Sequence, residues 1–216
     1  MRIDVKGTVI PDNYAWIYDL FDEPYISPGK IHAALEEAAG DDIDLDINSA
    51  GGDVFAGSDI YAAIRDYPGN VNIHVVGLAA SAASVIACAG HSDIAPTAQV
   101  MVHNVSCYSG GDYHDHDKTS EILKQANRAI AAAYTAKSAK LSEKDALDLM
   151  NTETWLTASD AVEWGLIDEI SENKNANKPT DDADDIRMAA AAGHMIPASV
   201  IDKMLQKQQD LIDFFS

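Results

Sequence analysis

Hydrophobic and polar residues alternate along two segments in the first half of the chain, and a helical pattern follows each of them. Residues 43–47 read Ile-Asp-Leu-Asp-Ile, the two-residue period of a β-strand with one buried face. Residues 54–67 then place apolar side chains at the spacing of a helix. The stretch between them, Asn-Ser-Ala-Gly-Gly-Asp at 48–53, has adjacent glycines that permit a tight turn and a close approach of the backbone to a ligand. The sequence therefore predicts a strand, a turn and a helix in this order.

The second segment places a serine at the start of a predicted helix. Residues 71–76 are β-rich and half apolar, Gly77 is predicted to turn the chain, and the small residues 79–89 are compatible with a helix. Ser81 would then lie where unpaired N–H groups and the helix dipole favour negative charge. Its hydroxyl is a candidate nucleophile, and a simple N-cap is the alternative interpretation.

A third segment ends in a histidine. Residues 99–104 read Gln-Val-Met-Val-His-Asn, a short apolar strand with His103 at its end. An imidazole at this place is suited to act as the general base for a serine. The alternative for a single histidine is a structural role.

Four ordered motifs resemble the Clp protease proteolytic subunit, ClpP. They are a strand followed by N-S-A-G-G-D at 48–53, G-L-A-A-S-A-A at 77–83, M-V-H-N at 101–104, and E-T-W-L-T-A-S-D-A-V-E-W-G-L-I-D at 153–168. The resemblance covers roughly residues 43–170. It implies an α/β fold, the ClpP/crotonase-like spiral of repeated ββα units, and a serine endopeptidase that needs no cofactor and no metal.

The resemblance also implies a role for individual residues. Ser81 matches the family nucleophile, His103 matches the general base, and the amides of Gly52 and Ala82 match the oxyanion hole. The substrate backbone is expected to add as an extended strand. The residues expected to border that strand are Gly51, Asp53, Val54, Asn104 and Val105.

Glu153 falls where the family has its catalytic aspartate, and its side chain is one methylene longer. It could orient His103 and stabilise the imidazolium, as an aspartate would. Alternatively, it is a solvated loop residue, and a backbone carbonyl or a water holds the imidazole.

The sequence divides into a peptidase domain and a tail. Residues 1–171 form the ClpP-like domain, residues 172–196 read as an acidic flexible linker, and residues 197–216 read as an amphipathic helix. Only a short predicted strand at 1–10 stands where ClpP has its longer ATPase-docking segment, so we expect no ATPase partner. This arrangement is similar to the head maturation proteases of phages and prophages, whose substrates would be capsid or scaffold proteins.

A long Ala-rich helix is predicted over residues 117–140, and it corresponds to the family's handle region. Its apolar residues are Ile122, Leu123, Ala126, Ile130 and Tyr134. In a monomer this stripe would face water, so another subunit is expected to cover it. We therefore expect a homo-oligomer, with a ring as the expected form.

Composition narrows the partners and the compartment. The chain has 216 residues with 35 acidic against 15 basic side chains, a formal charge of −20, which argues against nucleic acid and anionic membranes. It has no apolar run of about 18 residues and no signal-peptide pattern, so a cytoplasmic location is expected. The two cysteines, Cys88 and Cys107, are expected to be reduced thiols.

Several other residues have a chemical interpretation beside a structural one. Cys107 could pair with His103 as a nucleophile, but it lacks the helix start that Ser81 has. Residues 112–117 could bind a metal through their histidines and aspartates, although a solvated loop is the favoured interpretation. Ser84 is interpreted as a small packing residue, and His74 as a residue packed or hydrogen-bonded in the sheet.

Three other functions are compatible with the same pattern. A housekeeping ATP-dependent Clp subunit would share the chemistry of Ser81 and His103. A crotonase-like acyl-CoA enzyme would use the paired amides without needing that serine and histidine. A non-catalytic scaffold would keep only the oligomeric surfaces.

Overall fold

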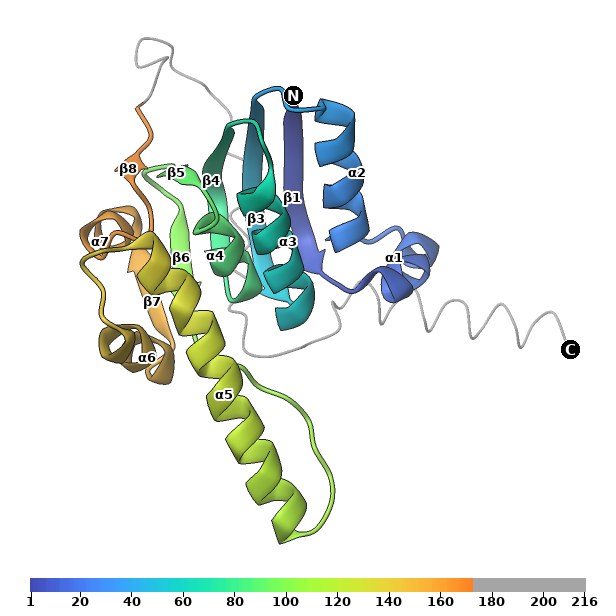
Figure 1. Ribbon diagram of the computed structural model, residues 1–216, viewed down its shortest axis with the longest axis vertical. Coiled ribbons are helices and arrows are strands. Elements are labelled where there is room, and N and C mark those ends of the chain that lie inside the picture. Colours follow the sequence, from blue (N-terminus) through green and yellow to red (C-terminus); the bar gives the residue numbers. More distant parts are fainter. Residues whose placement is uncertain (173–216) are drawn as a thin grey trace, which may run out of the picture.

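The computed structural model describes residues 1–172 (Figure 1). The strands are β1 (Arg2–Val9), β2 (Tyr25–Ile26), β3 (Ile43–Gly52), β4 (Val71–Ala80), β5 (His91–Ile94), β6 (Gln99–Val102), β7 (Thr154–Thr157) and β8 (Glu169–Ile170). The helices are α1 (Ala15–Phe21), α2 (Pro28–Ala38), α3 (Val54–Asp66), α4 (Ala82–Ala87), α5 (Tyr113–Lys137), α6 (Glu143–Asn151) and α7 (Ala158–Glu163). A short 3-10 turn, η1 (Asp12–Tyr14), precedes α1. The expected α/β class is confirmed.

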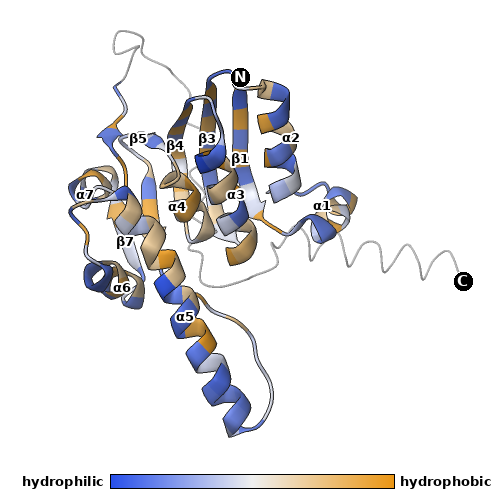
Figure 2. Ribbon diagram, viewed as in Figure 1, coloured by the Kyte–Doolittle hydropathy of each residue, from blue (hydrophilic) through white to orange (hydrophobic). Residues whose placement is uncertain are grey.

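The described strands form one sheet in the order β2-β1-β3-β4-β5-β8, and all these pairs are parallel. Strand β6 pairs with the end of β4 in parallel, and β7 pairs with β6 in antiparallel. Helices α2, α3 and α4 lie on one side of the sheet (Figure 1). Alternate strand residues face this helical layer and are fully buried, among them Leu45, Ile47, Ile73 and Val75. The two-residue period seen in the sequence therefore marks the core (Figure 2).

Gly77 does not turn the chain, contrary to the sequence-based expectation. Strand β4 continues through it to Ala80, and the register against β3 shifts between the Ile47–Val75 and Ser49–Ala79 pairs. A Cβ atom on Gly77 would lie 2.6 Å from Oδ1 of Asn48, so the glycine is needed for close approach of the two strands. Before this irregularity β4 pairs with β5, and after it β4 pairs with β6.

Helix α4 is shorter than expected, with Ala82–Ala87 in place of residues 79–89. Helix α5 begins at Tyr113, four residues before the predicted start at 117, and ends at Lys137 instead of 140. The early start has a local cause, because Asp112 and Asp115 form a capping box. The histidines and aspartates that were interpreted as a polar loop therefore mostly belong to the first turns of α5.

The apolar stripe of α5 is covered by the described residues only towards its C-terminal end, so the expectation that another subunit covers the rest stays a prediction. Ile130 and Tyr134 are buried against the body of the domain. Ile122 is 58% exposed and belongs to the N-terminal half of α5. This half of the helix extends away from the domain (Figure 1). The free end of α5 is mostly hydrophilic (Figure 2).

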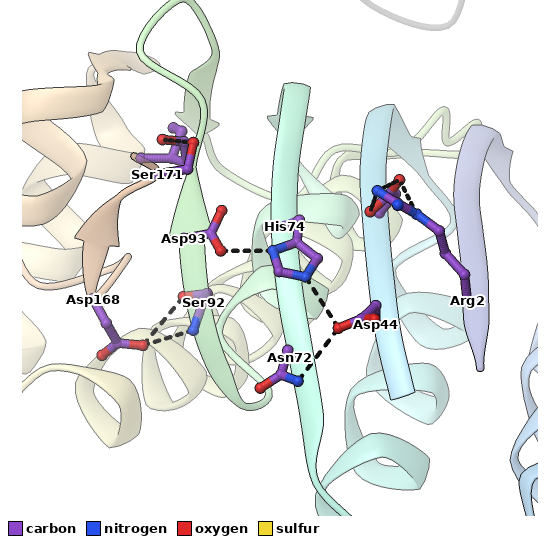
Figure 3. Close-up of polar contacts among 10 residues, drawn as sticks. Arg2, Asp44, Asn72, His74, Ser92, Asp93, Asp168 and Ser171 are labelled. Atoms are coloured by element: carbon purple, nitrogen blue, oxygen red, sulfur yellow. Dashed lines mark hydrogen bonds and ion pairs between the residues drawn. The ribbon is translucent and has the colours of Figure 1, made fainter. Parts of the chain in front are cut away.

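The opposite face of the sheet carries a polar network (Figure 3). Nδ1 of His74 lies 2.6 Å from Oδ2 of Asp93, and Nε2 lies 3.4 Å from Oδ1 of Asp44. The hydrogen bond with His74 lowers the pKa of Asp44. Arg2 contacts both carboxylate oxygens of Asp46. The interpretation of His74 as a hydrogen-bonded sheet residue is confirmed.

Two expectations lie outside the described residues, namely most of the acidic linker at 172–196 and the amphipathic helix at 197–216. Within residues 1–172, no helix is both long and apolar enough to cross a bilayer. Both cysteines are free thiols, with Cys88 buried and Cys107 exposed.

Candidate active site

The carboxyl ends of β4 and β6 bring a serine and a histidine together. The two strands run parallel with Ala80 opposite Met101, so Ser81 and His103 follow neighbouring strand ends. Nε2 of His103 lies 2.7 Å from Oγ of Ser81, within hydrogen-bond distance. The amide of Ser81 donates to the carbonyl oxygen of Met101 at 2.9 Å and ties the two strand ends to each other.

Ser81 makes the sharp turn that the sequence had suggested for Gly77. Its φ of 54° and ψ of −124° are unusual for a residue with a side chain and cost on the order of 1–3 kcal/mol. Ser81 occupies the N-cap position of α4, yet its side chain makes no capping hydrogen bond. Its hydroxyl interacts with His103 instead, so the interpretation of the side chain as an N-cap is wrong.

The glycine pair at the end of β3 packs directly against this turn. A Cβ atom on Gly51 would lie 2.7 Å from Cβ of Ser81 and 2.8 Å from the amide nitrogen of Ala82. Gly51 has a φ of +90° and Gly52 a φ of +152°, values that favour glycine. The glycine pair therefore lies in close contact with the backbone of Ser81 and Ala82. Asp53, the next residue, caps α3 by accepting hydrogen bonds from the amides of Phe55 and Ala56.

A cavity of about 280 Å³ opens beside the serine and histidine. Seven of the predicted residues line it: Gly52, Asp53, Val54, Ser81, Ala82, His103 and Val105. The other lining residues are not predicted from the sequence as part of the site: Phe55, Val85, Ser106, Cys107, Ile122, Leu123, Ala126, Ile130 and Tyr134. Several of these form the apolar stripe of α5, which was attributed to oligomerisation. The same stripe could have indicated a substrate groove.

Comparison with known proteins identifies a family that shares the sequence of most of this chain. The family model described as Clp protease matches residues 29–174. The chain belongs to the Clp protease family. It is 34% identical over 145 residues to the ATP-dependent Clp protease proteolytic subunit 1 of Streptomyces avermitilis, covering 64% of this chain and 65% of that protein.

Other members of the Clp protease family show a similar degree of likeness. The proteolytic subunit 2 of Thermobifida fusca is 33% identical over 138 residues, with 61% of this chain and 66% of that protein covered. The proteolytic subunit of Bacteroides fragilis is 31% identical over 134 residues, with 61% and 64% covered. The chain thus spans just under two thirds of the length of these three relatives.

Glu153 immediately precedes β7, the strand that pairs with β6. Strands β6 and β7 pair Val102 with Thr154, so His103 and Glu153 each adjoin the last pair of this antiparallel ladder. Glu153 is an exposed turn residue with a φ of 47°. The end of the ladder therefore places the two residues in the same neighbourhood, and the role of Glu153 stays a prediction.

The two residues after His103 are engaged by neighbouring helices. The side-chain amide of Asn104 donates to Oδ1 of Asn151 at 2.9 Å, and among the described residues Oδ1 of Asn104 is buried without a hydrogen-bond partner. The backbone amide of Val105 donates to Oδ1 of Asn127 at 2.8 Å. An incoming peptide would therefore not find a free amide at Val105.

The remaining chemical candidates are not assembled into sites. His103 pairs with Ser81, and Cys107 borders the same cavity as an exposed free thiol. In the part of the chain that the structure describes, no group of three or more His, Cys, Asp or Glu side chains is arranged to hold a metal ion. The Ser81–His103 pair is thus the nucleophile–base arrangement that this cavity presents.

Proposed function

We propose that the protein is a serine endopeptidase of the ClpP type. The observation that carries this proposal is the 2.7 Å contact between Oγ of Ser81 and Nε2 of His103 at the edge of an apolar cavity. His103 takes the hydroxyl proton as Ser81 attacks a peptide carbonyl, and it returns the proton to the leaving amine. Water then hydrolyses the acyl-enzyme by the same route.

Backbone amides of Gly52 and Ala82 hold the negatively charged oxygen of the tetrahedral intermediate in this proposal. Both residues line the cavity together with Ser81. The close packing of Gly51 on Ser81 and Ala82 supports the assignment, because it brings the end of β3 to the start of α4. Two preorganised donors of this kind commonly supply the largest single contribution to acyl-transfer catalysis.

Glu153 acts as the residue that orients His103. The strand register supports this role, since both residues adjoin the Val102–Thr154 pair of the β6–β7 ladder. Glu153 is exposed, and in this proposal a rotamer change turns its carboxylate towards the imidazole. That change would complete a triad with one methylene more than the aspartate of the family.

The substrate is an extended polypeptide whose backbone lies along the end of β3, beside Gly52, Asp53 and Val54. The cavity is apolar on the side of α5 and so accommodates an apolar side chain. On the His103 side, the amide of Val105 is already bonded to Asn127, so a substrate pairs there with other backbone groups of the segment.

Ser81 and His103 favour a protease over the other functions compatible with the sequence. A crotonase-like acyl-CoA enzyme would use the backbone amides without a hydrogen-bonded serine and histidine. A non-catalytic scaffold would not need Ser81 to adopt a strained conformation against His103.

Assembly into a homo-oligomeric ring, and the choice of substrate, are further parts of the proposal. The relatives are named as proteolytic subunits of an ATP-dependent protease, which supports a multi-subunit assembly. The narrower proposal is a phage-type head maturation protease that cuts capsid or scaffold protein without an ATPase. A housekeeping Clp subunit is the competing assignment, and it would require an added ATPase to cleave a folded protein.

Peptide hydrolysis by matched serine variants tests the proposal. Ser81→Ala should abolish cleavage of a small fluorogenic peptide, whereas Ser159→Ala, an exposed serine of α7, should cleave at the wild-type rate. Both variants should have the wild-type oligomeric state and melting temperature. Undiminished cleavage by Ser81→Ala would overturn the proposal.

A further inference from the structure

Two buried hydroxyl groups are linked by hydrogen bonds to the backbone of Ser81. Ser84 of α4 is 1% exposed and Tyr134 of α5 is 2% exposed. Oγ of Ser84 lies 2.6 Å from the carbonyl oxygen of Ser81 and 2.8 Å from the phenolic oxygen of Tyr134. The three residues thus form a chain of hydrogen bonds from the long helix to the backbone of the nucleophile.

The direction of this chain follows from counting hydrogens. A serine hydroxyl has one hydrogen, and that of Ser84 is donated to the carbonyl oxygen of Ser81. Ser84 can then only accept from Tyr134, whose hydroxyl is the donor of the second bond. Burial raises the pKa of Tyr134, so its phenol stays protonated and able to donate over the neutral pH range.

The acceptor at the end of these hydrogen bonds belongs to a strained backbone segment, since Ser81 has a φ of 54°. The carbonyl of Ser81 accepts from the Ser84 amide at 3.0 Å as well as from the Ser84 hydroxyl. A residue with positive φ keeps that conformation only when its surroundings over-determine it. Hydrogen bonds arranged in series polarise one another, so the tyrosine strengthens the bond that Ser84 makes to Ser81.

We propose that Tyr134 is a positioning residue for the nucleophile, which it holds in place through Ser84. The inference rests on the proposed peptidase function and adds two residues to it that the sequence analysis had treated as packing or oligomer contacts. Tyr134 also lines the cavity, and its side chain consists of an apolar ring and a hydroxyl that is hydrogen-bonded to Ser84. The two parts of the side chain are separable by mutation.

The phenylalanine variant removes the hydroxyl and keeps the ring. Tyr134→Phe should lower kcat for a small peptide about tenfold with KM within twofold of wild type, because Oγ of Ser81 is less well placed while the cavity wall is unchanged. The rate of fluorophosphonate labelling should fall by a similar factor. Ser84→Ala should lower kcat by a similar factor. The double variant should lose no more kcat than the stronger single variant, because both substitutions interrupt the same series of hydrogen bonds.

Tyr67→Phe is the matched control. The Tyr67 hydroxyl accepts from the amide of Gly40 at 2.9 Å and donates to the carbonyl of Asp41 at 2.8 Å, at the end of α3 away from the site. Its loss should lower the melting temperature and leave kcat unchanged. A kcat of Tyr134→Phe within twofold of wild type, with lower thermal stability as in the control, would overturn the proposal and leave a structural role.

Other outcomes separate this inference from the function on which it rests. If wild-type protein neither hydrolyses peptide nor reacts with the fluorophosphonate, the proposed function itself fails. If Tyr134→Phe does not fold, Ser84→Ala decides, because alanine is smaller and suits a helix. Wild-type kcat in a folded Ser84→Ala variant would equally overturn the proposal.

Discussion

At the scale of single residues, the site depends on backbone that only particular residues tolerate. Ser81 keeps a positive φ with a full side chain, and Gly51 leaves the space that this turn occupies. Ser81, His103 and the glycine pair could be identified from the sequence, because strand ends and adjacent glycines leave a local pattern. Ser84 and Tyr134 could not, because their contact joins residues 50 positions apart.

Gly51→Ala should greatly reduce activity. The new Cβ would lie 2.5 Å from the carbonyl oxygen of Ala80 and 2.7 Å from Cβ of Ser81, so the serine turn must move. A misplacement of about 1 Å can cost about 100-fold in rate, which is the loss we expect in kcat/KM. Gly110→Ala is the control, because a Cβ there has no atom within 4 Å. Equal activity of the two variants would show that the close packing is unimportant.

Glu153→Gln should lower kcat by about 10²–10⁴-fold and change KM much less, if the carboxylate orients His103 and stabilises its positive charge. Steady-state kinetics on a small peptide measures this, with the exposed Glu163→Gln as a control that keeps wild-type rates. An effect below about threefold would remove Glu153 from the site and leave another group to hold the imidazole.

At the scale of elements, hydrophobic periodicity predicted the existence of the main strands and helices better than their ends. The ends depend on contacts distant in sequence or on single caps. Strand β4 passes through Gly77 because Asn48 of β3 packs against it, and α5 starts early because Asp112 caps it. The apolar stripe of α5 was visible in the sequence, but only the packing of α5 on the domain shows that the stripe lines a cavity.

One ion pair joins the end of α5 to the segment before β8, and it should make stability depend on acid. Lys137 bonds to Asp168, which also accepts from the amide of Ser92 at 2.8 Å. Partial burial opposes ionisation of Asp168, but these hydrogen bonds outweigh it and lower its pKa. The stabilisation is therefore present above the ordinary carboxylate pKa of about 4 and is lost as the pH falls through the lowered value.

Asp168→Asn should lower the free energy of unfolding at pH 7 by roughly 1–3 kcal/mol, because it leaves the Lys137 ammonium without its carboxylate. The Lys137 side chain is only 8% exposed but that of Asp168 is 37% exposed, so the loss lies between the values of about 0–1 kcal/mol for surface pairs and about 3–5 kcal/mol for buried pairs. The difference from wild type should shrink in acid. Urea unfolding at several pH values measures it. Asp148→Asn is the control, since its partner Lys144 is 81% exposed and such surface pairs contribute about 0–1 kcal/mol. A pH-independent difference would contradict the assignment.

At the scale of the whole molecule, one hydrophobic cluster unites the helical layer and the sheet within the described residues. A chain ending at Asn173 is therefore expected to fold and to cleave a small peptide without an ATPase. Circular dichroism, size-exclusion chromatography and a peptide assay test this expectation. Insoluble truncated protein would show that the tail belongs to the core, and a strict need for an unfoldase and ATP would favour a housekeeping Clp subunit.

The central claim is that Ser81 is a nucleophile activated by His103, and covalent labelling tests it most directly. Full-length protein is treated with a fluorophosphonate, and the modified residue is identified by mass spectrometry. The account predicts a single adduct on Ser81, formed at least about 100-fold more slowly in His103→Ala because the general base is lost. An adduct on Ser84 or Cys107, or a His103→Ala variant that reacts at the wild-type rate, would contradict it.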